Sequence, residues 1–243
     1  MSKGSIRILL GGNSQHGKST LAKLLAPESR AVIGDGSEPT IQKTVEYISN
    51  CQTISVLDSP GINANTAHTE MAKCNGNHAD IFILVSLTEK TLHENVIALC
   101  RHFSDQGVPL VIVLNCKGLS HEQVKFNDPK RDSPIHRETR AILASVDIEA
   151  KKIFTVNLAW AAASRGILSG HTDLLLKIKS DWERLFPSDP ECRTMYGRSR
   201  FEELRQFALQ PSPAVFDEDG LLTSALLGRI QRKIYSVGIH YGQ

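Results

Sequence analysis

At positions 12–19 the chain reads Gly12-Asn13-Ser14-Gln15-His16-Gly17-Lys18-Ser19, and Thr20 follows. This stretch satisfies the phosphate-binding pattern G-x-x-x-x-G-K-[ST] at every fixed position. The apolar run 6–10 before it predicts a short buried strand, and leucines at helical spacing after Ser19 predict a helix. The order of strand, glycine-rich loop and helix is the one that a phosphate-binding loop requires.

This order indicates a specific chemistry for the loop. Its backbone N–H groups would curl around phosphates, and the positive end of the helix dipole would face them. Lys18 is expected to reach the β- and γ-phosphates, and the Ser19 hydroxyl to ligate Mg2+. A glycine turn that contains Lys-Ser by chance is the alternative, and the flanking strand and helix disfavour it.

The composition narrows the class of protein. With 243 residues, 41% of them hydrophobic and 22% charged, the chain can bury a full core. Its longest apolar runs, such as 81–85 and 110–114, are too short to span a bilayer. A net charge of +2 does not indicate a nucleic-acid partner, and five cysteines without a C-x-x-C pair favour a reducing compartment. We therefore expect a cytoplasmic protein without a signal peptide.

The region after the first helix contains two predicted strands, 44–48 and 53–57, joined by a short polar link. So short a link permits an antiparallel hairpin and excludes a parallel crossover. The second strand ends in Asp58-Ser59-Pro60-Gly61. An aspartate at this strand tip can hold Mg2+ through a water, and the Gly61 amide can meet a γ-phosphate. An ordinary loop turn is the alternative.

In these features the chain resembles GTPases of the translation-factor-related class, in the branch of Era, MnmE and dynamin-like proteins, over most of residues 5–186. The triplet Pro39-Thr40-Ile41 lies where such proteins keep their first switch. The resemblance implies that Thr40 binds Mg2+ and senses the γ-phosphate, with Thr44 as the weaker candidate and a threonine that merely opens a strand as the alternative. The polar stretch 63–77 is expected to be a mobile second switch.

The resemblance also implies where the base would bind. After the predicted strand 110–114 the family pattern is Asn-Lys-x-Asp, and this chain has Asn115-Cys116-Lys117-Gly118. Asn115 and Lys117 are expected to contact the nucleotide. Gly118 replaces the aspartate that recognises guanine. In the second base-contacting loop, Leu158 and Ala159 are the expected contacts, and Trp160 is expected to fill the core.

The expected catalytic set is Lys18, Gln15, Thr40 and Gly61, and the expected metal ligands are Ser19, Thr40 and Asp58. Ile62 and Asn63 stand where many GTPases carry a catalytic glutamine. By resemblance, Gln15 is expected to steer water or to coordinate K+, while His16 points away from the phosphates. The nucleotide contacts expected from the loop are Gly12, Asn13, Ser14, Gln15, His16, Gly17, Lys18, Ser19 and Thr20.

These observations predict an α/β fold, the P-loop three-layer sandwich. It would have a mixed sheet of about six strands, one antiparallel edge strand and helices on both faces. The nucleotide domain would comprise residues 1–187, and residues 188–243 a helical extension. The expected partners are GTP and GDP, with self-association or a protein partner through the switches or the C-terminal helices. No clear nucleic-acid or membrane signal is present.

The function predicted is that of a Mg2+-dependent protein that binds GTP and hydrolyses it to GDP as a conformational switch. The alternative is a nucleotide-binding module with negligible hydrolysis or with relaxed specificity that admits ATP. The predicted hairpin before Asp58 disfavours a small-molecule kinase. A scaffold that has lost nucleotide binding is disfavoured because Gly17, Lys18 and Ser19 are all present.

Overall fold

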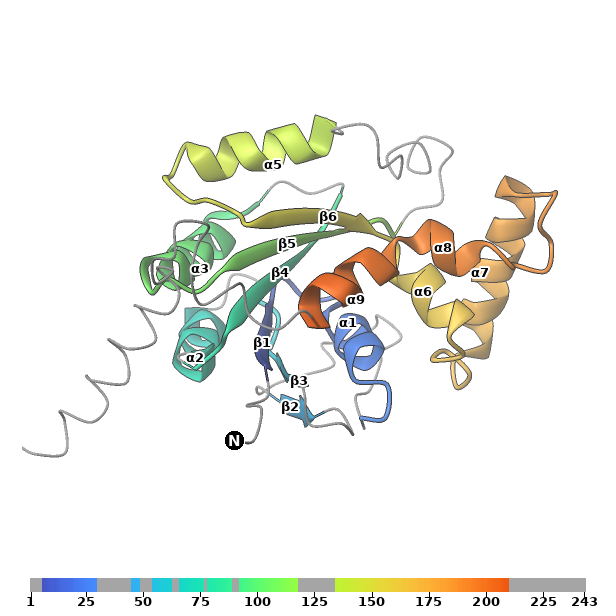
Figure 1. Cartoon of the computed structure of the whole chain (residues 1–243), viewed down its shortest axis with the longest axis horizontal. Helices are drawn as coiled ribbons and strands as arrows, with labels where there is room; N and C mark the ends of the chain where they lie inside the picture. Colours follow the sequence, from blue (N-terminus) through green and yellow to red (C-terminus); the bar gives the residue numbers. More distant parts are fainter. Residues whose placement is uncertain are drawn as a thin grey trace, which may run out of the picture.

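A computed structural model describes residues 6–29, 45–48, 54–62, 66–76, 78–88, 92–117 and 134–209. In these ranges a six-stranded sheet has the order β2-β3-β1-β4-β5-β6 (Figure 1). The strands are β1 (Ile6–Gly11), β2 (Val45–Ile48), β3 (Ile54–Asp58), β4 (Ile81–Leu87), β5 (Leu110–Asn115) and β6 (Lys152–Val156). The pair β2–β3 is antiparallel and the other pairs are parallel, which confirms the predicted hairpin and mixed sheet.

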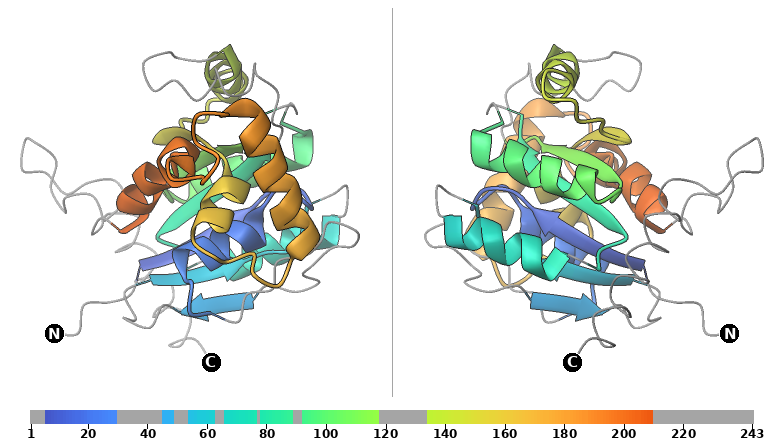
Figure 2. Two further views of the ribbon diagram at one scale, coloured as in Figure 1. Left: turned by 90° about the vertical axis from the view of Figure 1, so that its right-hand side faces the viewer. Right: turned by 90° about the vertical axis from the view of Figure 1, so that its left-hand side faces the viewer.

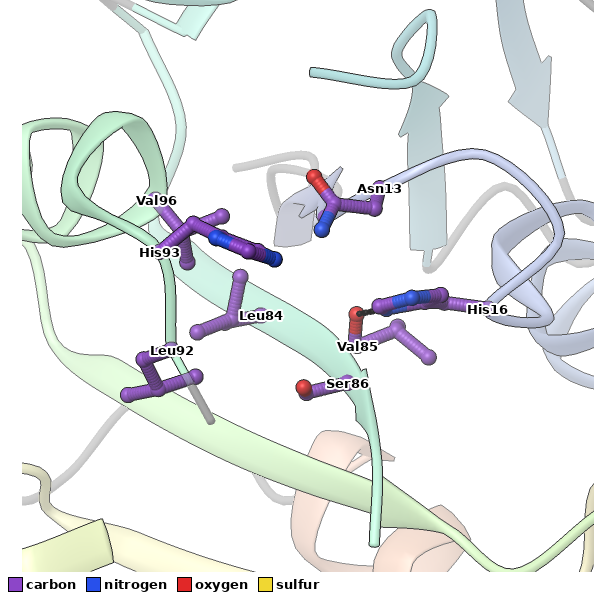
Figure 3. A pocket seen from close by; sticks show the side chains of 9 residues that line it. Asn13, His16, Leu84, Val85, Ser86, Leu92, His93 and Val96 are labelled. Carbon is purple, nitrogen blue, oxygen red and sulfur yellow. Dashed lines mark hydrogen bonds between the residues drawn. The ribbon is translucent and has the colours of Figure 1, made fainter. Parts of the chain in front are cut away.

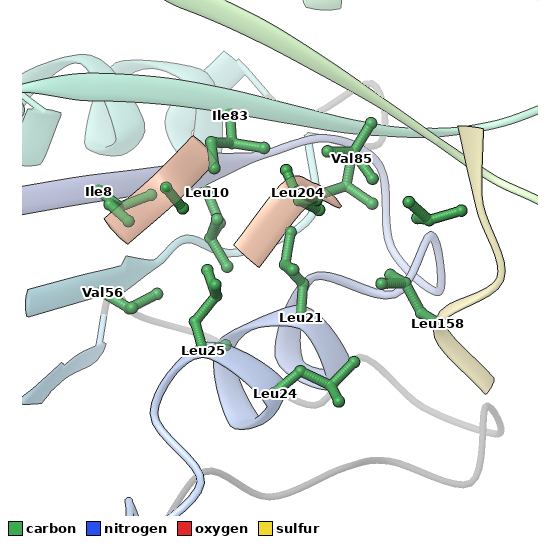
Figure 4. Close-up of a cluster of buried hydrophobic side chains, with 14 of the residues drawn as sticks. Ile8, Leu10, Leu21, Leu24, Leu25, Val56, Ile83, Val85, Leu158 and Leu204 are labelled. Atoms are coloured by element: carbon green, nitrogen blue, oxygen red, sulfur yellow. The ribbon is translucent and has the colours of Figure 1, made fainter. Parts of the chain in front are cut away.

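The central strands are apolar along their whole length because both faces of the sheet are covered. In β4, Ile83 and Val85 face one cluster of core side chains, whereas Phe82 and Leu84 face another. This alternation follows from the two-residue repeat of a strand. Figure 4 shows the first cluster, in which side chains of β1, β3 and β4 meet leucines of the helix that follows the phosphate loop.

Helices lie on both sides of the sheet (Figure 2). One face is covered by α1 (Lys18–Leu25), α6 (Leu158–Ser164) and α9 (Phe201–Leu209), and the other by α2 (Thr66–Gly76), α3 (Glu94–Asp105) and α5 (Pro134–Ala144). Beside α6 lie α7 (Thr172–Leu185) and α8 (Met195–Ser199). No helix within the described ranges is both long and apolar enough to cross a membrane.

The stretch 63–77, predicted as a mobile second switch, contains a helix that the sequence did not indicate. Residues 66–76 form this helix, α2. The buried side chains of α2 are small rather than strongly apolar: Ala72 is fully buried, and Thr69 is nearly so. At Gly76 an added Cβ would collide with the Phe103 ring, so α2 packs closely on α3. Small residues that fit against a neighbouring helix leave little hydrophobic periodicity, so the sequence gives little indication of this helix.

A third cluster joins α6, α7 and the segment leading to α8. Trp160 is 2% exposed and meets the Trp182 ring edge-on at 5.0 Å between centroids, which confirms its place in the core. Beyond this cluster, Phe201 and Leu204 of α9 belong to the main core on the α1 face. The division at residue 187 stays a prediction, and side chains of α9 share a core cluster with those of α1 and the sheet. Residues 210–243 of the predicted helical extension lie outside the described residues.

Candidate nucleotide-binding site

The phosphate loop lies where the direction of the chain's crossovers reverses. β1 and β4 are neighbours in the sheet, yet β1 leads into α1 on one face and β4 leads into α3 on the other. In open α/β sheets, the crevice at the carboxyl ends of two such strands is the usual ligand site. The geometry of the fold therefore places Gly12 to Ser19 at the position where a ligand is expected.

Local backbone geometry makes the loop suitable for an anion. Gly17 has a left-handed φ of 103° and forms the N-cap of α1, and the first turn of α1 contains no acidic residue. A Cβ at Gly17 would come within 2.7 Å of Asn115 Nδ2, so only glycine fits there. The N-terminal end of α1 is thus kept clear of bulky and negative groups, which favours binding of phosphate.

Lys18 is held in place by the loop that precedes it. Its Nζ donates hydrogen bonds to the carbonyl oxygens of Gly12 at 3.0 Å and Asn13 at 2.9 Å. The residue is 7% exposed. Burial lowers the pKa of Lys18 to about 8, and the nearby Asp58 carboxylate opposes that shift. A buried ammonium in a fixed position is a ready partner for a phosphate charge.

Asp58 ends β3 and pairs with Leu10 in the sheet register. It is fully buried, and among the described residues neither carboxylate oxygen has a partner in hydrogen-bonding geometry. Burial raises the pKa of Asp58 to about 6, while Lys18 and the nearby Ser19 hydroxyl favour the charged form. A buried carboxylate beside a hydroxyl, with oxygens left unsatisfied, fits a Mg2+ ligand set.

The turn after Asp58 is attached to the phosphate loop. Ser59 Oγ donates to the Leu10 carbonyl at 2.6 Å, and the Ile62 amide donates to the Gly12 carbonyl at 3.2 Å. A Cβ on Gly61 would collide with Ser14, so Gly61 lies directly against the loop. Ile62 is fully buried and apolar, and it therefore cannot orient a water molecule.

Asn115 has a role that the sequence did not suggest. Its Nδ2 donates to the His16 carbonyl at 2.9 Å, and its Oδ1 accepts from the Leu158 amide at 3.2 Å. The side chain thus joins the phosphate loop to the end of β5 and to the start of α6. Cys116 is 1% exposed, and its amide donates to the Val156 carbonyl at 2.8 Å, so its side chain lies in the core.

The other expected site residues are distributed as follows. Gln15 is exposed with a φ of 63°, Ser14 and Thr20 are half-buried, and His16 is buried with Nδ1 3.3 Å from the Val85 carbonyl oxygen. Lys117 is exposed and Ala159 is half-buried, both at the carboxyl edge of the sheet. Thr40, Thr44, Asn63 and Gly118 lie outside the described residues.

A pocket beside the loop was not anticipated. Figure 3 shows it between the phosphate loop, β4 and the start of α3. Its polar side chains are Asn13, His16, Ser86 and His93. The only sequence signal for it is a histidine immediately before a predicted helix, and a lone histidine is too common to indicate a site.

Comparisons with known proteins agree with this geometry. Residues 7–116 match the profile of a family described as 50S ribosome-binding GTPase. A structure of Era in complex with MgGDPNP and nucleotides of 16S ribosomal RNA has a TM-score of 0.53 at 14% identity, covering 91% of this chain and 62% of that chain. A single-residue variant of Aquifex aeolicus Era bound to GDP and AlF4− has a TM-score of 0.53 at 16% identity. The match covers 90% of this chain and 61% of that chain.

The chain therefore spans about three fifths of the length of these Era chains, 62% and 61%. A search of curated protein sequences returned no significant match. Residues 7–116 are thus similar to this GTPase family, and the likeness to the two Era structures, at 14% and 16% identity, shows that the fold is shared.

Proposed function

We propose that this chain binds GTP with Mg2+ and hydrolyses it to GDP, and that the two nucleotide states differ in the conformation of the switches. The observation that carries the proposal is the pair of buried opposite charges, Lys18 and Asp58, beside the phosphate loop. Burying two such groups opposes folding unless a ligand uses them. A triphosphate with a divalent cation supplies a counter-charge to each.

Each residue of the loop has a defined task in this proposal. The amides of the loop and the N-terminal end of α1 bind the phosphates, and Lys18 neutralises charge on the β- and γ-phosphates. Ser19 and Asp58, with Thr40, would hold Mg2+, which when bound adds positive charge next to the same phosphates. The Gly61 amide, which lies against Ser14, contacts the γ-phosphate.

Hydrolysis requires a group that orients water, and Ile62 does not supply it. We assign this task to Gln15, the exposed polar side chain in the middle of the loop. In this role Gln15 either steers the water directly or coordinates a K+ ion. Its backbone is left-handed, with φ of 63°.

The switch mechanism follows from the attachment of the two loops. Because the Ile62 amide donates to the Gly12 carbonyl, the residue immediately before the second switch is linked directly to the phosphate loop. A contact between Gly61 and the γ-phosphate would therefore be transmitted toward α2. We place nucleotide-dependent self-association, or binding of a protein partner, at this switch surface or at the C-terminal helices.

A second candidate function is supported by Cys116. Its burial means that it cannot lie along a base as the family's lysine does. Together with Gly118 in place of the aspartate, this favours a nucleotide-binding module with relaxed base specificity or with negligible hydrolysis.

Single-turnover hydrolysis tests the proposal. Radiolabelled GTP is mixed with excess protein and Mg2+, in K+ or in Na+, and inorganic phosphate is measured. The wild type is expected to hydrolyse GTP faster in K+, and Lys18→Ala to lose roughly 100-fold or more of the rate. Lys177→Ala, an exposed lysine of α7, is the matched control and should behave as the wild type. Tight GTP binding without hydrolysis by the wild type would favour the second candidate.

A further inference from the structure

The pocket beside the phosphate loop contains polar groups that the proposed mechanism does not use. His93 immediately precedes α3, and Asn13 occupies the first variable position of the loop. In Figure 3 the Asn13 carboxamide and the His93 ring face each other across the pocket. These two residues come from the two elements that flank the reversal point of the sheet, so a contact between them would join the phosphate loop to α3.

The surroundings of these two side chains favour a direct interaction. Leu84, Leu92 and Val96 line the same pocket, and Val96 is 3% exposed. His93 is exposed and Asn13 is half-buried, and a carboxamide and an imidazole both donate and accept hydrogen bonds, so the two side chains are able to pair with each other. His16 and Ser86 lie at the other end, where the His16 ring is directed to the Val85 carbonyl.

Asn13 is also connected to the phosphate chemistry. Its backbone carbonyl accepts a hydrogen bond from Lys18 Nζ at 2.9 Å. The Asn13 carbonyl is thus one of the two backbone carbonyls, with that of Gly12, that hold the ammonium group in position. During hydrolysis the water oxygen bonds to the γ-phosphorus and gives a proton to the released phosphate or to solvent. The bond from that phosphorus to the β–γ bridging oxygen breaks, and GDP keeps the electron pair. Lys18 stabilises this charge only if it is placed correctly.

We propose that His93 is a positioning residue for hydrolysis, which pairs with the Asn13 side chain and thereby fixes one of the two carbonyls that hold Lys18. This inference rests on the proposed GTPase function. It predicts that His93 contributes more to the rate of hydrolysis than to the binding of nucleotide, because a small displacement of Lys18 affects the transition state most.

The test compares His93→Ala, Asn13→Ala and the double variant with the wild type. Single-turnover GTP hydrolysis and GDP affinity are measured for each, and thermal melting confirms that each is folded. We expect a rate loss of about 10-fold for either single variant and for the double variant alike, with GDP affinity within about 2-fold of wild type. His93→Gln, which keeps a donor and an acceptor, should retain most of the rate. His78→Ala, an exposed histidine before β4, is the matched control.

Three outcomes overturn the inference. The first is that His93→Ala hydrolyses GTP at the rate of wild type and of His78→Ala. The second is that the two single losses multiply to about 100-fold in the double variant. The third is that GDP affinity falls as much as the rate of hydrolysis. If His93→Ala does not fold, the comparison of His93→Gln with Asn13→Ala decides: a full rate in the first and a loss in the second support the pair. A wild type that neither binds nor hydrolyses GTP would instead contradict the proposed function itself.

Discussion

Lys18 and Asp58 are both ionisable, both buried and close enough to influence each other's pKa. The pKa of Asp58 is raised from its ordinary value of 3.8 to about 6, and the pKa of Lys18 is lowered from 10.5 to about 8, in both cases mainly by burial. The attraction between the two opposes both shifts but does not cancel them. In the protein without nucleotide, the charged forms therefore destabilise the fold near neutral pH.

The sign of the pH dependence follows from Asp58. Its pKa is higher in the folded state, so between about pH 4 and pH 6 the folded state binds more protons, and stability falls as pH rises. At about 1.4 kcal/mol per pKa unit, the shift corresponds to a loss of roughly 3 kcal/mol. For Lys18 the direction is opposite, and stability is regained as pH rises from about 8 toward 10.5.

Asp58→Asn tests this assignment. Without nucleotide, we expect the variant to melt at a higher temperature than the wild type at pH 7.5, and the difference to shrink toward pH 5, where Asp58 takes up a proton. With GDP and Mg2+ the order should reverse, because the amide cannot satisfy the cation. Differential scanning calorimetry in each condition makes the measurement. A lower melting temperature for the nucleotide-free variant at pH 7.5 would show that the carboxylate stabilises the fold.

At the level of elements, two buried asparagines hold the carboxyl edge of the sheet together in different ways. Asn115 bridges the phosphate loop and the start of α6. Asn157 caps α6, and its Oδ1 accepts from the Trp160 amide at 3.0 Å. Only the first of these side chains touches the loop that would bind phosphate.

This difference gives a matched pair of substitutions. Asn115→Ala leaves a donor and an acceptor unpaired, and we expect a stability loss of about 1–3 kcal/mol and a loss of roughly 10-fold or more in nucleotide affinity. Asn157→Ala should lose about 1 kcal/mol, as helix caps do, with a smaller effect on affinity. Chemical denaturation and fluorescence titration with a labelled GDP measure both. Equal losses of affinity would contradict the bridging role.

The same elements show which parts of the structure the sequence predicts. The strands were predictable because their apolar runs are local signals, and the phosphate loop because its motif fixes residue types at fixed spacing. The bridging role of Asn115 was not, since it depends on three segments that meet only after folding. The pocket with His93 was missed for the same reason. The helix α2 was missed because small residues such as Ala72 pack it against α3.

On the scale of the whole molecule, the chain beyond residue 187 continues into the core. Leu204 of α9 is fully buried in the cluster that includes Leu21 of α1 and Ile83 of β4. Two salt bridges, Arg200 with Glu203 and Arg205 with Glu202, lie within the same region of the surface. Such exposed pairs contribute little, so the apolar contacts of α9 determine how firmly it is attached.

Leu204→Ala tests whether α9 is part of the folding unit. We expect the variant to lose about 2–5 kcal/mol, as buried leucines do, with one cooperative transition. Leu176→Ala is the matched control, because Leu176 is 60% exposed and its loss should be within about 0.5 kcal/mol. Urea denaturation followed by tryptophan fluorescence measures both. An unchanged midpoint for Leu204→Ala would show that α9 belongs to a separate extension.

The central claim, that Gly12 to Ser19 binds GTP through Lys18, is tested most directly by isothermal titration calorimetry. The protein is titrated with GTP, GDP, ATP and XTP in the presence of Mg2+, beside the Lys18→Ala variant. We expect GTP and GDP to bind more tightly than ATP, and Lys18→Ala to lose binding. Equal affinity for ATP and GTP, or a variant that binds as the wild type does, would contradict it.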